Sequence, residues 1–236
     1  MNSLPVVLCI GGSDPGAGAG LQMDESTVRE LGCEFRGVCA VDTVQDNSGI
    51  HSANPRSTAE VLVEVEDALA DGRVRAVKTG ALGLVSTVRG LFQPLRNRPD
   101  LPLVIDPVAS ASKQATEGVL LLESGGLAAM LHGIGSIATV VTPNLQEYEA
   151  SEYNDCRAVF LKGGHGEGIE VKDQLLIPGK HPMDFISPRI PGADGTHGTG
   201  CMLASAVASY LARGLPLNHA CSAAHSFVHQ YLLGLQ

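Results

Sequence analysis

Short runs of apolar residues alternate along the chain with segments whose apolar residues recur every three or four positions. The short runs lack the alternation of period two that marks a strand with one face in water, so they predict strands covered on both faces. The segments with the longer period predict amphipathic helices. The expected strands are residues 4–12, 35–45, 75–82, 102–108, 138–144 and 157–164, and the expected helices are residues 24–31, 55–70, 86–95 and 201–213.

This alternation predicts a doubly wound α/β fold, in which helices flank a mostly parallel sheet. The length of 236 residues suits a single domain over residues 1–236, and no internal repeat, low-complexity tract or linker interrupts the chain. Several of the 28 glycines and 13 prolines lie at the ends of expected strands. Because such folds bind ligands beyond the carboxyl ends of their strands, we expect the functional site there.

The charge of the chain excludes some partners. The formal net charge is −9 and no run is rich in Lys and Arg, which argues against a nucleic-acid or anionic-membrane surface. The first ten residues carry no basic segment, and no stretch approaches the roughly 20 apolar residues of a membrane helix, so we expect a cytoplasmic protein. The six cysteines lack C-x-x-C spacing, which indicates mostly reduced core residues without zinc or disulfides.

The first glycine cluster, GGSDPGAGAG at residues 11–20, follows an expected strand and precedes an expected helix. It lacks the Lys-Ser/Thr ending of a P-loop and the G-x-G-x-x-G spacing of dinucleotide folds. Two interpretations stay open. The glycines could serve a turn that needs positive φ, with Asp24 as a helix cap, or they could let a planar ligand approach the backbone while Asp24 binds a polar edge of its ring.

A second cluster, THGTGC at residues 196–201, carries more chemistry. Gly198, Thr199 and Gly200 permit a loop whose N–H groups point inward at the start of a helix, which makes an anion hole. Phosphoryl transfer needs such a hole, because negative charge on the transferring group must be held while a hydroxyl attacks. Cys201 would lie at the helix N-terminus, where the dipole is expected to lower its pKa and favour a base or a nucleophile. A buried, inert cysteine is the competing interpretation.

The order of the motifs resembles that of a known family. GGSDPGAGAGLQMD, VQDNSG, VKTGALG, VIDPV, VTPNLQE, FLKGGH and THGTGC follow one another as in the hydroxymethylpyrimidine/phosphomethylpyrimidine kinases, the ribokinase-like enzymes of thiamin biosynthesis. The resemblance covers almost the whole chain, and other ribokinase-like kinases usually carry Asp where this chain has Cys201. It implies ATP-dependent phosphorylation of hydroxymethylpyrimidine or its monophosphate with Mg²⁺, in a homodimer.

The resemblance also implies roles for individual residues. Cys201 would take the proton of the reacting hydroxyl or lie beside a phosphate oxygen, while the N–H groups of residues 198–201 hold the transferring phosphoryl group. The pyrimidine would contact Gly12, Ala19, Asp24, Gln45 and Val108. ATP would contact Asp106, Lys162 and Thr196, and Asn144 and Glu147 would hold Mg²⁺ through water. His165 and His197 are expected to line the nucleotide groove.

Three departures from the family pattern keep the function open. Only SEYND separates TPNLQEYEA from the next expected strand, where the family normally has a helix and connection of about twenty residues or more. Ala81 replaces a frequent Met, and DPVASASKQ, which includes Ala109, changes the segment after Val108. The ring pocket is therefore expected to be roomier. A pyridoxal-type vitamin kinase and a non-catalytic binder of pyrimidines or nucleotides remain alternatives.

Overall fold

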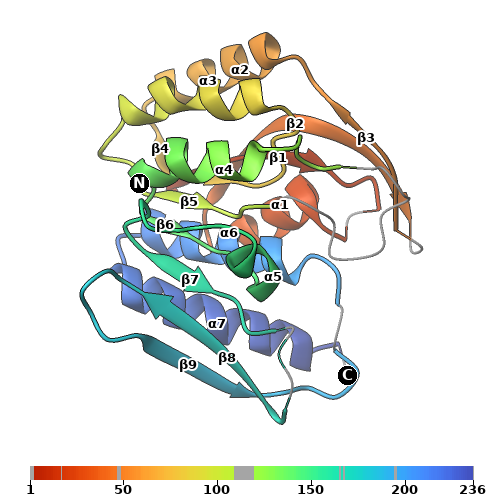
Figure 1. The fold of residues 1–236 in the computed structure, drawn as a ribbon, viewed down its shortest axis with the longest axis vertical. Helices are drawn as coiled ribbons and strands as arrows, with labels where there is room; N and C mark the ends of the chain where they lie inside the picture. Colours follow the sequence, from red (N-terminus) through yellow and green to blue (C-terminus); the bar gives the residue numbers. More distant parts are fainter. Residues whose placement is uncertain are drawn as a thin grey trace.

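The computed structural model describes residues 3–16, 18–46, 49–108, 120–164, 166, 168–193 and 196–235, without the side chains of residues 45, 46 and 49. Within this part of the chain, nine strands form one sheet in the order β3-β2-β1-β4-β5-β6-β7-β8-β9 (Figure 1). The strands are β1 (Val6–Ser13), β2 (Glu34–Asp46), β3 (Gly49–Pro55), β4 (Val74–Thr79), β5 (Leu103–Ile105), β6 (Val140–Val141), β7 (Val159–Leu161), β8 (Glu170–Leu176) and β9 (Met183–Pro188). In the order of the sheet, β2, β1, β4, β5, β6 and β7 pair in parallel. β3 pairs antiparallel at one edge, and β8 and β9 pair antiparallel at the other.

Helices cover both faces of the sheet, which confirms the predicted α/β fold (Figure 1). One face packs against α2 (Thr58–Ala70), α3 (Val85–Arg96), α4 (Gly126–Met130) and the π-helical segment η1 (Leu131–Gly135). The other face packs against α1 (Gly20–Glu30), α6 (Thr199–Ala212) and α7 (Leu217–Leu233). The short helix α5 (Leu145–Glu149) lies between β6 and β7 in the chain. No helix of the described chain is both long and apolar enough to cross a membrane.

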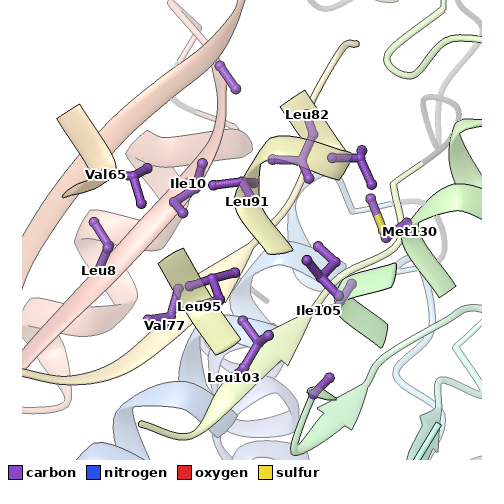
Figure 2. Packing of buried hydrophobic residues seen from close by; sticks show 14 of the residues in the cluster. Leu8, Ile10, Val65, Val77, Leu82, Leu91, Leu95, Leu103, Ile105 and Met130 are labelled. Atoms are coloured by element: carbon purple, nitrogen blue, oxygen red, sulfur yellow. The ribbon is translucent and has the colours of Figure 1, made fainter. Parts of the chain in front are cut away.

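Alternate residues of each central strand enter opposite cores. Leu8 and Ile10 of β1 join the core under α2 and α3, which Figure 2 shows, whereas Val7 and Cys9 join the core under α1 and α6. Both faces of β1 are therefore buried. This explains why the central strands are apolar runs rather than alternating patterns.

Two helix boundaries differ from the prediction by three residues or more. The helix expected to begin at residue 24 begins at Gly20, so Asp24 lies inside α1 and is not its cap. The helix expected from residue 55 begins at Thr58, because Pro55 ends β3 and pairs with Val41, while the Ser57 side chain caps the helix. The apolar pattern did not indicate these boundaries, because α1 begins in a glycine-rich segment and α2 follows an edge strand directly.

The shortened connection after residue 149 forms a complete crossover. β6 and β7 pair in parallel, and α5 with the loop after it links them. The rings of Tyr148 and Tyr153 stack with centroids 5.2 Å apart, and the Tyr153 hydroxyl donates a hydrogen bond to the Glu147 carbonyl at 3.1 Å. Both tyrosines pack on the core that α3 covers. Two aromatic side chains thus fill space where the family pattern predicts a longer helix.

Candidate active site

A cavity of about 230 Å³ opens at the carboxyl ends of the parallel strands. It lies where the strand order changes direction, because β1 stands between β2 and β4. Its walls come from the loops after β1, β4, β5 and β6, the first turn of α6, and the β8, β9 and α7 side of the sheet. The cavity therefore lies at the edge where the sequence predicts a functional site.

A buried ion pair forms the floor of the cavity. Lys78 of β4 places its Nζ 2.8 Å from each carboxylate oxygen of Asp24, and the Ser205 hydroxyl donates to Asp24 Oδ1 at 2.7 Å. The side chains of Lys78 and Asp24 are 1% and 0% exposed. Burial alone would lower the pKa of Lys78, but the Asp24 carboxylate and other nearby groups raise it above its usual range.

This ion pair bears on the predicted contact between Asp24 and the substrate ring. Three of the roughly four lone-pair directions of its carboxylate accept hydrogen bonds from Lys78 and Ser205. Asp24 lines the cavity, but its geometry favours holding Lys78 over direct contact with a ring. Sequence reasoning missed Lys78, although a lysine inside the apolar run of residues 75–82 is a signal, because a lysine buried in a strand needs a partner.

A second ion pair lies on the phosphate side of the cavity. Lys162, just after β7, donates from Nζ to Asp106 Oδ1 at 2.7 Å. Burial on its own would lower the pKa of Lys162, but the carboxylates of Asp106 and Glu147 together raise it. Lys162 therefore stays a cation at neutral pH. Asp106, Lys162 and Glu147 all line the cavity, so the structure brings these three predicted residues together, and their roles stay a prediction.

Asn144 and Glu147 form a capping box at the start of α5. Asn144 Oδ1 accepts from the Glu147 N–H, and Glu147 Oε2 accepts from the Asn144 N–H, both at 2.8 Å. Glu147 is nevertheless buried and lines the cavity, so the cap does not lie on the surface. The box fixes the direction in which the Glu147 carboxylate points.

The two glycine clusters touch each other at the start of α6. Gly198 is the N-cap with φ of 84°, and a Cβ there would overlap the Gly18 carbonyl. A Cβ on Gly200 would lie 3.3 Å from Nζ of Lys162. The Lys162 cation thus lies against the first turn of a 14-residue helix, whose N–H groups and dipole also favour an anion. The predicted anion hole would therefore include the Lys162 ammonium group as well as backbone N–H groups.

The loop that contains Thr196 and Thr199 is held by its own hydroxyls. Thr196 Oγ1 donates to the Ala193 carbonyl at 2.8 Å, and Thr199 Oγ1 donates to the Thr196 carbonyl at 3.2 Å. Both residues line the cavity. Their hydroxyls hold the approach to the anion hole in place, and ligand contact by either side chain stays a prediction.

Asp14 holds the first glycine cluster in place. Its buried carboxylate accepts from the N–H groups of Gly16, Gly18 and Ala19 at 2.7–3.0 Å. His197 places Nε2 3.7 Å from Asp14 Oδ2, which links the two clusters. Sequence reasoning missed Asp14, although an aspartate before a run of small residues often accepts from backbone N–H groups.

The remaining predicted substrate contacts lie on one wall. Gly12, Ala19, Ala81 and Val108 all line the cavity, together with the apolar side chains of Ile50 and Leu121. Small residues thus form the surface that a planar ring would contact. The backbone of Gln45 lies in β2, but its side chain is outside the described part of the structure, as are residues Ala109 and His165.

Cys201 lies in the first turn of α6 and lines the cavity. Burial raises the pKa of its thiol to about 11, Lys78 opposes this shift, and the Asp106 and Asp24 carboxylates add to it. The expectation that the helix dipole lowers this pKa is therefore wrong. Cys201 reaches the cavity whereas Cys9 is fully buried, so both the catalytic and the inert interpretation of Cys201 stay open.

We expect alkylation of Cys201 by iodoacetamide to accelerate about tenfold per pH unit between pH 7 and 10. With a pKa of about 11, roughly one thiol in a thousand is ionised at pH 8, and only the thiolate reacts. Rates at single cysteines, followed by peptide mass spectrometry, provide the measurement, and Cys201→Ser identifies the labelled peptide. A rate that levels off below pH 8 would show instead a thiol activated by the helix dipole.

Solved structures place this arrangement in a class of enzymes. The pyridoxal kinase from Staphylococcus aureus in complex with AMP-PCP and pyridoxal matches with a TM-score of 0.83 and 26% identity, covering 97% of this chain and 87% of that chain. The fold is thus that of the ribokinase-like vitamin kinases, α/β proteins with a mostly parallel sheet flanked by helices.

Sequence comparison narrows this class to a family. The family model for phosphomethylpyrimidine kinase matches residues 14–152 and 150–234. The hydroxymethylpyrimidine/phosphomethylpyrimidine kinase of Rhizobium meliloti (strain 1021) is 34% identical over 243 residues, which cover 95% of this chain and 89% of the relative. The chain belongs to the phosphomethylpyrimidine kinase family, which confirms the resemblance of its motifs.

Some relatives are longer. The thiamine biosynthesis bifunctional protein ThiED of Geobacter sulfurreducens is 34% identical over 246 residues, which cover 94% of this chain but 48% of that protein. The chain thus spans about half the length of this bifunctional relative.

Proposed function

We propose that this protein transfers the γ-phosphoryl group of ATP to 4-amino-5-hydroxymethyl-2-methylpyrimidine, to its monophosphate, or to both, as a step of thiamin biosynthesis. One observation carries the proposal. Lys162 lies against the first turn of α6 in a cavity that small residues also line. The first feature suits a phosphoryl group in transfer, and the second suits a flat heterocycle. The motifs and the family membership support the same activity.

In this proposal the phosphates contact both Lys162 and the N–H groups of residues 198–201. These donors hold the negative charge that spreads over the transferring group, and they are fixed before the reaction begins. The pyrimidine lies against Gly12, Ala19 and Val108, with its hydroxyl toward Cys201. Because the Cys201 thiol is mostly protonated at neutral pH, its role as a base belongs to a small thiolate fraction. Charge stabilisation by Lys162 and the helix is therefore expected to contribute more than proton removal.

The residues present fit Mg²⁺ bound mainly through water. Among the residues that the structure describes, no group of three His, Cys, Asp or Glu side chains could enclose a metal ion. Mg²⁺ keeps several waters and often needs only one or two carboxylates beside phosphate oxygens. Glu147 would supply this carboxylate with Asp106 nearby, and Asn144 would orient Glu147 through the capping box. Bound Mg²⁺ would neutralise phosphate charge.

Pyridoxal kinase activity is the second candidate. The structural match to a pyridoxal kinase with bound pyridoxal favours it, and so does Ala81, whose small side chain leaves room on the ring wall. Pyridoxal also carries a hydroxymethyl group on a planar ring, so the same phosphate site would serve both substrates. In this proposal the two candidate substrates are distinguished by how their rings contact this wall.

The proposal is tested by following ATP consumption with Mg²⁺ and, in parallel, hydroxymethylpyrimidine, its monophosphate and pyridoxal. We expect mass spectrometry to identify a phosphorylated product from at least one pyrimidine. A product from pyridoxal alone would select the second candidate. Thermal stabilisation by ATP without any product would instead identify a binding protein descended from the kinases, and the enzyme proposal would be wrong.

A further inference from the structure

All three polar groups of Glu147 form hydrogen bonds within the chain. Its N–H donates to Asn144 Oδ1, and its carboxylate accepts from the Asn144 N–H, which together make the capping box. Its carbonyl oxygen accepts from the Tyr153 hydroxyl at 3.1 Å. Asn144 therefore holds Glu147 from the start of α5, and Tyr153 holds it from beyond the end of this helix.

The Tyr153 hydroxyl supplies a hydrogen bond that α5 is too short to make. The last four carbonyls of a helix have no N–H partner in the same helix. The Glu147 carbonyl is one of them, because α5 ends at Glu149. A helix of five residues is also marginal without contacts to the rest of the protein. Tyr153 therefore stabilises the C-terminal end of α5.

Tyr153 is itself held in the shortened connection between β6 and β7. Its ring stacks on Tyr148 and packs against the core that α3 covers. Two residues further on, Asp155 places its carboxylate 2.7 Å from His132 Nδ1 of η1. Burial raises the pKa of Tyr153 above its usual range, and the Glu147 carboxylate adds to this shift. The hydroxyl therefore keeps the proton that it donates to the Glu147 carbonyl.

We propose that Tyr153 is a positioning residue, which fixes the Glu147 carboxylate for Mg²⁺ bound with ATP and so takes the place of the longer connection in the family pattern. The inference rests on the proposed function, in which Glu147 supplies the carboxylate for Mg²⁺. Glu147 is buried and lines the cavity, so a tilt of α5 moves its carboxylate relative to the phosphate site. Without the Tyr153 hydroxyl, α5 has to become ordered when Mg²⁺ binds, and this ordering lowers the affinity.

The first experiment compares the affinity for ADP with and without Mg²⁺ by isothermal titration calorimetry, so no phosphoryl transfer is involved. We expect Mg²⁺ to tighten ADP binding to wild type. Tyr153→Phe keeps the stacked ring and removes only the hydroxyl, and it should reduce this tightening about threefold to tenfold, the range that one neutral hydrogen bond supports. Its affinity for ADP alone should equal that of wild type. Tyr148→Phe, which removes the hydroxyl of the other ring in the stack, is the matched control and should match wild type in both titrations.

A double variant tests whether Tyr153 acts through Glu147. Glu147→Gln removes the carboxylate charge, and the addition of Tyr153→Phe should then cause no further loss of the Mg²⁺ effect. Steady-state kinetics supply a second measurement. In Tyr153→Phe the Mg²⁺ concentration for half-maximal rate should rise about threefold to tenfold, with kcat at saturating Mg²⁺ unchanged. A tyrosine that served stability alone would leave this concentration at the wild-type value.

Equal Mg²⁺ effects in wild type and Tyr153→Phe would overturn the inference, and so would a further loss in the double variant. Hydrogen exchange of ligand-free wild type decides the question even where Tyr153→Phe fails to fold. The N–H groups of Tyr148 and Ala150 donate to carbonyls one turn earlier and should be protected at least about tenfold, whereas unprotected N–H groups would show that α5 is not fixed before Mg²⁺ binds and that the inference is wrong. Absence of any Mg²⁺ effect on ADP binding to wild type would instead overturn the proposed role of Glu147 itself.

Discussion

Replacing Lys78 by methionine is expected to lower the free energy of unfolding by about 3–5 kcal/mol, because the change leaves a buried carboxylate without its counter-ion. Lys78 donates a hydrogen bond to each carboxylate oxygen of Asp24. The other donor to this carboxylate is the Ser205 hydroxyl. Neither member of the pair reaches bulk water, so solvent cannot replace the lost ammonium. Urea denaturation of wild type and Lys78→Met measures the difference.

The double variant Lys78→Met/Asp24→Asn separates charge from packing. It removes both charges, and we expect it to recover most of the lost stability, since a buried ion pair itself contributes little net free energy. Lys172→Met is the surface control, because its ion pair with Asp184 is exposed to water and its loss should change the stability little. A loss below about 1 kcal/mol in Lys78→Met would show that the Asp24 carboxylate finds another partner or is neutral in the folded protein.

The parallel strands and the helices on both sides of their sheet were predictable because they follow a repeated physical pattern. Runs such as residues 4–12 have both faces buried, and this requires helices on both sides of the sheet. β8 and β9 do not follow the pattern, because they are antiparallel strands near an edge and expose alternate residues such as Lys172 and Ile186. α7 was missed because its buried face is built from Ala220, Cys221, Ala224 and His225, which give little hydrophobic contrast.

The site was predictable only where one segment carries its whole geometry. The THGTGC loop and the start of α6 are such a segment, although α6 begins at Thr199, two residues before the expected start. Lys78 contacts a carboxylate 54 positions away, and no local spacing reveals this contact. Asp14, in contrast, accepts from backbone N–H groups within five positions, so its local signal was overlooked. The prediction of a lowered pKa for Cys201 was wrong for a similar reason. Burial by segments distant in the sequence raises the pKa of this thiol.

The two lysines that line the cavity differ in their hydrogen bonds. Lys78 is saturated by Asp24 at the floor of the cavity, whereas Lys162 has one hydrogen bond to Asp106 and lies beside the first turn of α6. The amino group of Lys162 has three donors, so two remain for phosphate oxygens. Lys78 is thus suited to structure and to the local field, and Lys162 is suited to contact with the transferring group.

Replacing Lys162 by methionine is therefore expected to lower kcat by about 10²–10³-fold, the range found when one fixed donor to developing charge is removed. The loss should appear in kcat as well as in kcat/KM, because the contact strengthens as charge spreads over the phosphoryl group. Initial rates at saturating ATP and pyrimidine provide the measurement. Lys172→Met, which removes an exposed lysine from the neighbouring strand β8, should retain wild-type kcat.

Folding is controlled separately, because Lys162→Met also leaves Asp106 buried without its cation. The double variant Lys162→Met/Asp106→Asn removes that charge and is expected to recover thermal stability without recovering kcat. Lys162→Arg keeps the charge but not the position of a single ammonium, so partial activity is expected. A folded Lys162→Met enzyme that keeps more than about a tenth of wild-type kcat would assign the stabilisation of the phosphoryl group to the N–H groups of α6 alone.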